Sequence, residues 1–272
     1  MSTAPIGLTN QLAAAGTLAG NPAYTQAERM QKEHFDRVAE LYEAHYSDPC
    51  SLSYRRRFIY EPMFAGLDLA GKRVLDAMCG SGQTSEYLLS RGALMTGLDI
   101  SPEVMEAYRR RWPGSHTICR SALDTGLPSD SFDCVSVVGG LHHMHPFLNE
   151  AVRELHRVLK PGGYLCFMEP HSGSLPDIVR RVWYKHDHLF SDNEAAVDLA
   201  AAEREFSSHF TFNRVKYQGS LGFLLVLNSM IFRIPLRLKP LYTPLLLALE
   251  SLISKLQGKK LSCFVVAQWQ KK

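Results

Sequence analysis

The chain has 272 residues, of which 46% are hydrophobic and 21% are charged, a composition typical of a globular protein. Its 30 Lys and Arg residues against 27 Asp and Glu residues give a net charge of +3. That excess is too small to favour nucleic-acid binding, and the length fits one large domain or one domain with a modest extension.

The six cysteines are widely spaced, and none has the spacing of a CxxC motif or a zinc site. Two of them, Cys134 and Cys166, lie inside apolar runs, where buried free thiols are the simplest interpretation. Residues 1–24 lack the basic start and apolar core of a signal peptide, and their Gly, Ala, Thr and Asn content predicts a flexible arm. We therefore expect a reducing compartment, the cytoplasm.

Two helices are predicted before the main α/β pattern begins. Residues 25–46 place apolar side chains in one stripe among charged ones, and Asp48-Pro49 ends that helix. A second helix is expected over about 52–66, with the run of three arginines at 55–57 as a solvated face. These two helices form a cap over residues 25–66.

From Lys72 onward, short apolar segments alternate with amphipathic ones. The apolar segments predict strands at 73–79, 94–101, 116–122, 132–140 and 164–170. The segments between them predict a turn and helix at 80–92 and helices at 102–112 and 148–160, the last closed by KPGG. This order is typical of an α/β, Rossmann-like, doubly wound and mostly parallel sheet with helices on both faces.

After Pro170 the pattern predicts two more helices and two more strands, seven strands in all. The helices are expected at 175–186 and 193–206, the second capped at Ser191, where SDNE is typical of a capping box. The strands are expected at 212–219 and 262–269, and the strongly apolar segment 221–257 lies between them.

A glycine-rich turn, Asp76-Ala-Met-Cys-Gly80-Ser-Gly82, directly follows the first strand of the sheet and precedes a helix. Glycine adopts unusual dihedrals and lets a ligand approach the backbone, while the helix presents its unpaired N–H groups. Asp99 ends the next strand, where a carboxylate can accept hydrogen bonds from both hydroxyls of a ribose. Ser101, just before Pro102, is the better cap for the following helix, which leaves Asp99 to a ligand.

These blocks resemble class I S-adenosylmethionine-dependent methyltransferases, especially the group of ubiquinone- and menaquinone-biosynthesis and other small-molecule methyltransferases. The family motif VLDxGxGxG corresponds to VLDAMCGSG here, and GLDIS, LPSDSFDCVSVVGGLHHM and ELHRVLKPGGYLCFMEP follow in register over residues 33–170. An NAD site is less favoured, because the third glycine of GxGxxG is replaced by Ser85.

The resemblance implies S-adenosylmethionine as the cofactor and S-adenosylhomocysteine as its product. It implies a cofactor-binding core at 72–170, an acceptor or lid region at 171–260 and a last strand at 261–269. The implied cofactor-binding residues are Tyr42, Asp76, Gly80, Gly82, Asp99, Ile100, Ser121, Ala122, Val138 and Gly139. The sequence departs from the family at Met78, which replaces a glycine, and at Ser121, which replaces an acidic residue. The adenine amino group is then bound by Ser121, by Asp124 or by the backbone of residues 122–123. Tyr42 and Tyr46 either close over the site or pack in the core.

The catalytic candidates follow the fourth and fifth strands, at the edge of the sheet where such folds bind ligands. His142 and His143 match a histidine pair of the family, in which they are either structural or supply a base, with His143 favoured here. Glu169 either orients a histidine or the substrate or bonds to nearby backbone. The stretch His186-Asp187-His188 lacks an established ligand spacing, so no metal is predicted.

The apolar segment 221–257 has two interpretations. Asn228, Arg233 and three prolines, Pro235, Pro240 and Pro244, interrupt it, so we expect no continuous helix and no membrane span. It is either a pair of helices acting as a lid or dimer surface, or a hydrophobic acceptor channel or interfacial patch with weak membrane-surface contact.

The function that these features predict is S-adenosylmethionine-dependent methyl transfer to the oxygen, nitrogen or carbon of a small molecule, extending to hydrophobic, lipid-like or secondary-metabolite acceptors. The alternative is a non-catalytic cofactor-binding protein or partner subunit that kept the fold. Retention of Asp76, Gly80, Gly82 and Asp99 favours the enzyme. A nucleic-acid acceptor is not expected, because VGGLHH stands where an NPPY-type block would be, and an oligomer is compatible with the sequence.

Overall fold

The computed structural model describes residues 26–184 and 194–272. Its centre is a seven-stranded sheet in the order β3-β2-β1-β4-β5-β7-β6. All pairings are parallel except those of β7, which runs antiparallel to both β5 and β6. The strands are β1 (Arg73–Ala77), β2 (Leu94–Asp99), β3 (His116–Cys119), β4 (Phe132–Val138), β5 (Leu159–Pro170), β6 (Phe210–Gln218) and β7 (Phe264–Lys271). The predicted Rossmann-like, mostly parallel sheet is confirmed.

Helices cover both faces of this sheet, because its central strands are buried on both sides. In β1, Leu75 faces one apolar cluster with α7 and α9, whereas Val74 faces a second cluster with the cap helices, α5 and α10. The helices are α2 (Gln26–Tyr46), α3 (Pro49–Tyr54), α4 (Glu61–Met63), α5 (Gln83–Ser90), α6 (Pro102–Arg111), α7 (Leu148–Val158), α8 (Leu175–Tyr184), α9 (Leu199–Glu205) and α10 (Lys239–Leu256).

Several predicted boundaries are wrong, each for a local reason. The second cap helix starts at Pro49, because Asp48 accepts hydrogen bonds from the backbone N–H of Cys50 and Ser51, and a π-helical turn at Arg55–Tyr60 joins α3 to α4. The helix predicted from 193 is α9, which starts at Leu199 with Asp198 as its cap. The predicted cap Ser191, the arm 1–24 and His186 to His188 lie outside the described residues.

The apolar segment forms a longer helix than its prolines suggested. Residues 239–256 are helical throughout, with Pro240 in the first turn and Pro244 inside the helix. Pro240 is tolerated in the first turn, where N–H groups lack helical partners, whereas Pro244 removes one backbone hydrogen bond inside the helix without ending it. The expected break at these prolines is therefore wrong, although no helix of the described chain is long and apolar enough to cross a bilayer.

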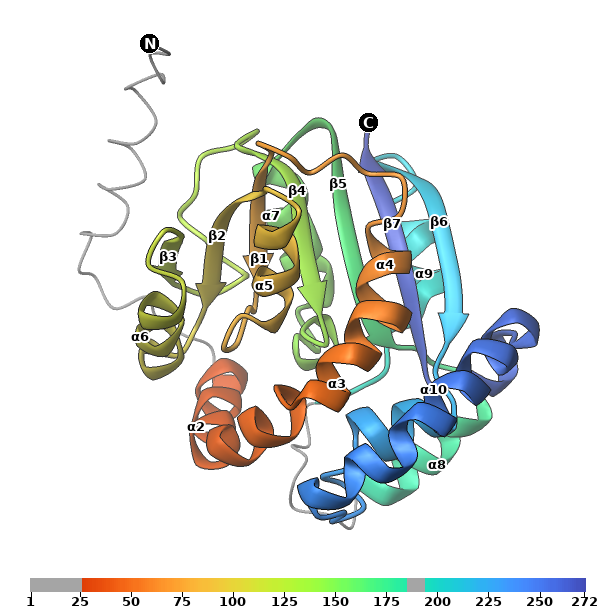
Figure 1. Ribbon diagram of the computed structural model, residues 1–272. Helices are drawn as coiled ribbons and strands as arrows, with labels where there is room; N and C mark the ends of the chain where they lie inside the picture. Colours follow the sequence, from red (N-terminus) through yellow and green to blue (C-terminus); the bar gives the residue numbers. More distant parts are fainter. Residues whose placement is uncertain (1–25, 185–193) are drawn as a thin grey trace.

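The strand order reverses between β1 and β4, which places a crevice at the carboxyl ends of these strands. Figure 1 shows α2, α8 and α10 gathered at that end of the sheet, toward which the arrows of β2 and β4 point. The fold thus brings the cap helices and the apolar segment together over the predicted glycine-rich turn.

Candidate active site

The glycine-rich turn has two glycines with different tasks. Gly80 has φ +52°, and a Cβ there would meet nothing within 4 Å, so its backbone stays open to the pocket that it lines. Gly82 has φ +85°, and its Cβ would lie 2.5 Å from the Trp112 Nε1. Gly82 is not among the residues that line the pocket. The missing side chain at Gly82 allows α5 to pack on α6. This packing explains the glycine without the ligand contact that the sequence predicted.

Met78 adopts a backbone conformation that ordinarily favours glycine. Its φ is +55°, in the left-handed region that costs an ordinary residue roughly 1 kcal/mol. Its side chain occupies the place where a Cβ on Gly140 would stand, 2.9 Å from the Met78 Sδ. The departure from the family motif therefore changes packing between two loops and leaves the path of the turn intact.

Two carboxylates, Asp76 and Asp99, line the pocket together with the glycine-rich turn. Asp76 is buried and accepts hydrogen bonds from Ser85 Oγ (2.7 Å) and Ser136 Oγ (3.0 Å), and burial raises its pKa to about 7. Asp99 accepts from the backbone N–H of Gly80 at 3.0 Å and lines the pocket. Each carboxylate oxygen carries two lone pairs, so Asp99 can also accept from a ribose hydroxyl. Ser101 caps α6 through the Val104 N–H at 3.3 Å, as predicted.

Ile100, Ser121 and Ala122 line the same part of the pocket. Ser121 Oγ accepts from the Leu123 N–H at 2.9 Å and bonds to the Glu28 carboxylate of α2. An acidic group therefore stands beside the position where the family usually has one, although it comes from a different helix. The sequence prediction missed Glu28, because helical periodicity does not say which part of α2 meets the sheet.

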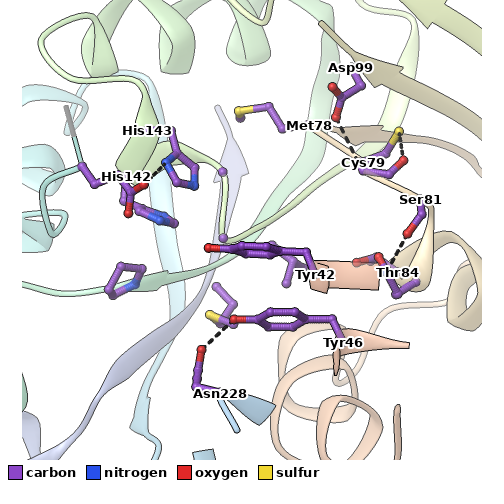
Figure 2. A pocket seen from close by; sticks show the side chains of 18 of the residues that line it. Tyr42, Tyr46, Met78, Cys79, Ser81, Thr84, Asp99, His142, His143 and Asn228 are labelled. Carbon is purple, nitrogen blue, oxygen red and sulfur yellow. Dashed lines mark hydrogen bonds and ion pairs between the residues drawn. The ribbon is translucent and has the colours of Figure 1, made fainter. Parts of the chain in front are cut away.

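The N-terminal helix is tied to the turn by a second acid, Glu43. Its carboxylate bonds to Ser81 Oγ and accepts from Gln83 Nε2 at 3.0 Å and from the Arg111 guanidinium at 3.0 Å. Nearby, Tyr42 and Tyr46 stack with ring centroids 5.4 Å apart (Figure 2). Both rings line the pocket, and Tyr46 also packs against the core.

Glu169 lies behind the histidine turn and is fully buried. It accepts from the backbone N–H groups of Gly140 (2.8 Å), Leu141 (2.7 Å) and His142 (3.2 Å), and its Oε2 lies 2.7 Å from His142 Nδ1. Burial raises the pKa of Glu169 to about 8 and lowers the pKa of His142 to about 3. Glu169 thus orients His142 and the turn, and it does not line the pocket.

The His143 ring lies against the His142 ring, with centroids 3.8 Å apart and a tilt of 40° between the ring planes. Its Nδ1 faces a carboxylate that the sequence prediction missed, with 3.7 Å to Oε1 of Glu194. Glu194 is brought there by the strand-like segment that follows it, because the Ala195 N–H donates to the His142 carbonyl at 3.2 Å. His142, His143 and Glu194 all line the pocket.

The cavity that these residues line has a volume of about 1340 Å³. Pockets for one small ligand usually measure about 300–1,000 Å³, so this one has room for a cofactor and a second molecule. Val138 and Gly139 lie where the halves meet. One half holds the glycine turn and Asp99, and the other is formed by apolar side chains, among them Leu175, Val179, Trp183, Phe223, Leu224, Ile231, Phe232 and Leu261.

A family model described as "Methyltransferase domain" matches residues 75–167, the segment that carries the turn, Asp99 and the histidine pair. This segment is a class I S-adenosylmethionine-dependent methyltransferase domain. A crystal structure of a SAM-dependent methyltransferase from Archaeoglobus fulgidus aligns with TM-score 0.58 at 19% identity, covering 86% of this chain and 99% of that chain, and this likeness shows the fold.

Two curated methyltransferases are similar to part of this chain. The malonyl-[acyl-carrier protein] O-methyltransferase of Salmonella typhimurium is 31% identical over 176 residues, 61% of this chain and 64% of that protein. The fatty-acid O-methyltransferase of Mycolicibacterium smegmatis is 35% identical over 115 residues, 41% of this chain and 42% of that protein. The matched segments thus span about half the length of these relatives.

Proposed function

We propose that this protein transfers the methyl group of S-adenosylmethionine to an oxygen atom of an apolar small molecule, producing S-adenosylhomocysteine. The observation that carries the proposal is the shape of the cavity, in which the cofactor turn of a methyltransferase domain opens into an apolar chamber. Oxygen is favoured over nitrogen or carbon because both relatives described above are named O-methyltransferases.

Methyl transfer breaks the sulfonium C–S bond, whose electron pair stays on sulfur, and forms a C–O bond with a lone pair of the acceptor oxygen. Asp99 would accept from the ribose hydroxyls, and the open backbone at Gly80 would let the cofactor's amino-acid portion approach. The enclosing walls align the oxygen with the methyl carbon and exclude water.

A hydroxyl acceptor must also lose a proton, whereas a carboxylate acceptor is already ionised near neutral pH. In the protein without a bound metal, His143 is the group we propose for that proton, with Glu194 beside its ring. His142 and Glu169 would act as positioning residues, because Glu169 fixes the turn on which both histidines stand.

The apolar chamber and the surface around it favour a lipid-like acceptor. Helix α10 exposes a stripe of leucines at helical spacing, including Leu241 (80% exposed), Leu245 (66%) and Leu256 (92%). Helix α8 adds Ile178, Val179 and Val182, each about half exposed or more, and exposed lysines at 255, 259 and 260 lie near the end of α10. We propose that this face rests weakly on an anionic lipid surface, from which the acceptor enters.

Sedimentation with vesicles tests the surface contact. The wild-type protein should sediment with vesicles that contain anionic lipid, and Leu245→Glu should reduce the bound fraction. Oligomer formation through the same leucines is the competing interpretation. It would appear as a dimer in analytical ultracentrifugation that Leu245→Glu dissociates, with no binding to vesicles.

Transfer of radiolabelled methyl groups from S-adenosylmethionine tests the proposed reaction. Long-chain fatty acids and hydroxylated aromatic compounds with an apolar tail should become labelled, and short polar analogues should not. Absence of label from every apolar acceptor, with cofactor binding intact, would favour the non-catalytic alternative.

We also propose a cytoplasmic location, consistent with six cysteines that are all free thiols.

A further inference from the structure

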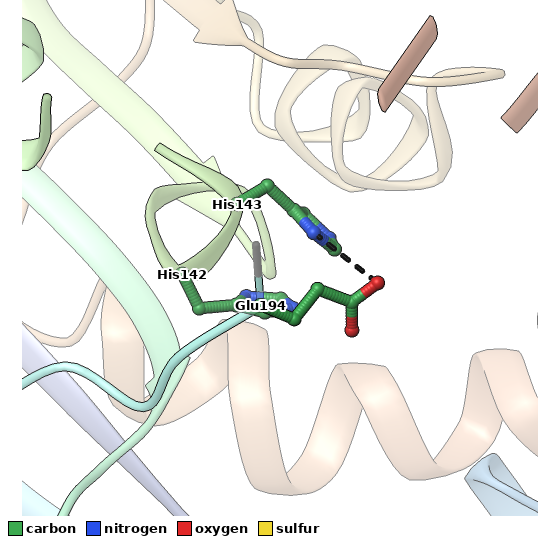
Figure 3. Close-up of side chains that lie close together, drawn as sticks. All are labelled: His142, His143 and Glu194. Atoms are coloured by element: carbon green, nitrogen blue, oxygen red, sulfur yellow. Dashed lines mark ion pairs between the residues drawn. The ribbon is translucent and has the colours of Figure 1, made fainter. Parts of the chain in front are cut away.

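The wall between the cofactor turn and the apolar chamber carries a group of side chains that methyl transfer alone does not require. His142, His143 and Glu194 each offer one ligand atom, and these atoms all lie within 4.8 Å of one another. Figure 3 shows the two imidazole rings and the carboxylate around one common space. We infer that these three side chains bind a divalent transition-metal ion, which holds the oxygen of the methyl acceptor.

The spacing of the ligand atoms suits an ion better than a direct contact. His143 Nδ1 and Glu194 Oε1 are 3.7 Å apart, which is too long for a hydrogen bond. An ion with bonds of roughly 2.1 Å to nitrogen and oxygen places tetrahedral ligands roughly 3.4 Å apart. Shifts of a few tenths of an ångström to roughly 1 Å would bring all three ligand atoms to that spacing.

The environment of His142 is that of a metal-bound histidine. One ring nitrogen of such a histidine commonly contacts a carboxylate, which fixes the ring and its tautomer while the other nitrogen binds the ion. Here Glu169 Oε2 lies 2.7 Å from His142 Nδ1, and Glu169 is itself held by three backbone N–H groups. This leaves Nε2 as the nitrogen that His142 offers to an ion.

The charges around the cluster are compatible with a cation. Glu169 and Glu194 are acidic groups in contact with the two histidines. Arg180 is a cation that acts on His142, and its guanidinium pairs with Asp177 at 2.9 Å. Two imidazoles and one carboxylate form a nitrogen and oxygen set that suits Zn²⁺, Mn²⁺ or Fe²⁺, whereas Mg²⁺ and Ca²⁺ prefer oxygen alone. Three protein ligands leave coordination positions open toward the pocket.

This inference rests on the proposed methyl transfer and deepens it. An ion at this place would bind the acceptor oxygen as a Lewis acid and make a hydroxyl proton acidic enough to dissociate to solvent. The oxygen lone pair then attacks the methyl carbon, and the C–S electron pair remains on sulfur. When the ion is bound, it replaces His143 as the group that activates the hydroxyl. This proposal of a site of two histidines and one glutamate differs from the sequence analysis, which predicted no metal.

Calorimetric titration of the untagged protein with Zn²⁺ alone tests the site. We expect one ion per chain with a dissociation constant in the micromolar range or below, and His143→Ala or Glu194→Gln should weaken binding by roughly 100-fold. Glu169→Gln should weaken it by about 10- to 100-fold. His209→Ala is the matched control, because His209 also lies beside a second histidine, His156, with ring centroids 5.1 Å apart.

The metal-binding site is refuted if Zn²⁺ does not bind, or if His143→Ala and Glu194→Gln bind it as the wild type does while retaining the wild-type melting temperature. Co²⁺ gives a second measurement, since its visible absorption bands report nitrogen and oxygen coordination and should vanish in the same two variants. Neither measurement involves the methyl donor, so failure of S-adenosylmethionine to bind would contradict the proposed function and leave the metal site standing.

The role of the ion in transfer is tested by chelation. Removal of the metal should lower the methyl-transfer rate to hydroxyl acceptors at least tenfold, and added Zn²⁺ or Mn²⁺ should restore it, while the affinity for S-adenosylmethionine stays the same. An unchanged rate after complete metal removal would refute the catalytic role and leave His143 as the base.

Discussion

The two halves of the pocket are built in different ways. The cofactor half is formed by residues that end successive strands, such as Asp76 in β1 and Asp99 in β2, so a few motifs in register specify it. The acceptor half is assembled from α2, α8 and the segment 221–261, which are far apart in the sequence. Buried polar contacts hold that half together, for example Lys239 Nζ with Ser51 Oγ at 2.7 Å. A local motif can specify the first kind of site, whereas packing alone specifies the second.

The largest effect should come from the residue that joins the two halves, Glu169. In Glu169→Ala, three backbone N–H groups lose their acceptor and His142 Nδ1 loses its hydrogen-bond partner, which should lower the free energy of unfolding by about 3–5 kcal/mol. Urea denaturation measures this loss, with the near-isosteric Glu169→Gln as the milder control. A loss below about 1 kcal/mol would mean that the histidine turn holds its shape without this carboxylate.

Asp99→Ala should weaken binding in the cofactor half of the pocket alone. The variant loses the proposed ribose hydrogen bonds and the bond to the Gly80 N–H, so the affinity for S-adenosylmethionine should fall about 30- to 100-fold. Equilibrium dialysis with labelled cofactor measures it. Asp124→Ala is the matched control, because that carboxylate is exposed and does not line the pocket. Equal affinities of the two variants would contradict the ribose assignment.

In the metal-free protein, stability should depend on pH through the buried groups at the boundary of the two halves. Burial raises the pKa of Asp76 to about 7 and of Glu169 to about 8, above their ordinary values of 3.8 and 4.5. The folded protein therefore holds these protons more tightly than the unfolded chain does, and the stability that they contribute below pH 4 is lost as pH rises toward 8.

His142 acts in the opposite sense, since its pKa of about 3 lies below 6.5 and its contribution grows only up to pH 6.5. The free energy of unfolding should thus fall by about 1–2 kcal/mol between pH 6.5 and 8. Urea denaturation at several pH values measures this slope, and Glu169→Gln should flatten it. Stability that rises over the same interval would contradict the protonated state of these carboxyls.

Val179→Asp should weaken binding in the acceptor half of the pocket alone. Val179 is 62% exposed at the mouth of the apolar chamber, so a carboxylate there should leave the fold intact and raise the KM for apolar acceptors about tenfold. Steady-state kinetics with a fixed cofactor concentration measures it, and cofactor affinity should not change. Val215→Asp, on β6 and outside the pocket lining, is the matched control. A joint loss of cofactor and acceptor binding would show that the halves are not separate.

The smallest effect is expected for Met78→Gly. Glycine relieves the left-handed strain at φ +55° but loses the packing against Gly140, so the two changes should offset within about 1 kcal/mol. Thermal and urea denaturation measure the balance. A tenfold change in cofactor affinity would instead show that the methionine side chain contributes to binding.

The sequence predicted the sheet and the path of the turn that ends its first strand, because strand periodicity, Gly80 and the Ser101 cap depend on neighbours along the chain. The sequence predicted a ligand contact for Gly82, whereas the structure explains this glycine by its packing against Trp112. That packing could not be predicted, because Trp112 is a neighbour only in the folded protein. Glu28, Glu43 and Glu194 could not be predicted, because no spacing indicates that they reach Ser121, Ser81 and His143. These missed residues come from α2 and from the segment before α9, where tertiary packing decides which side chains meet.

Calorimetric titration of the wild-type protein with S-adenosylhomocysteine tests the central claim most directly, because the product carries the adenosine and amino-acid groups that the cofactor half would hold. We predict one site per chain, with the same affinity in Val179→Asp and a loss of roughly 30-fold or more in Asp99→Ala. Absence of binding to the folded wild-type protein at high concentration would contradict the account.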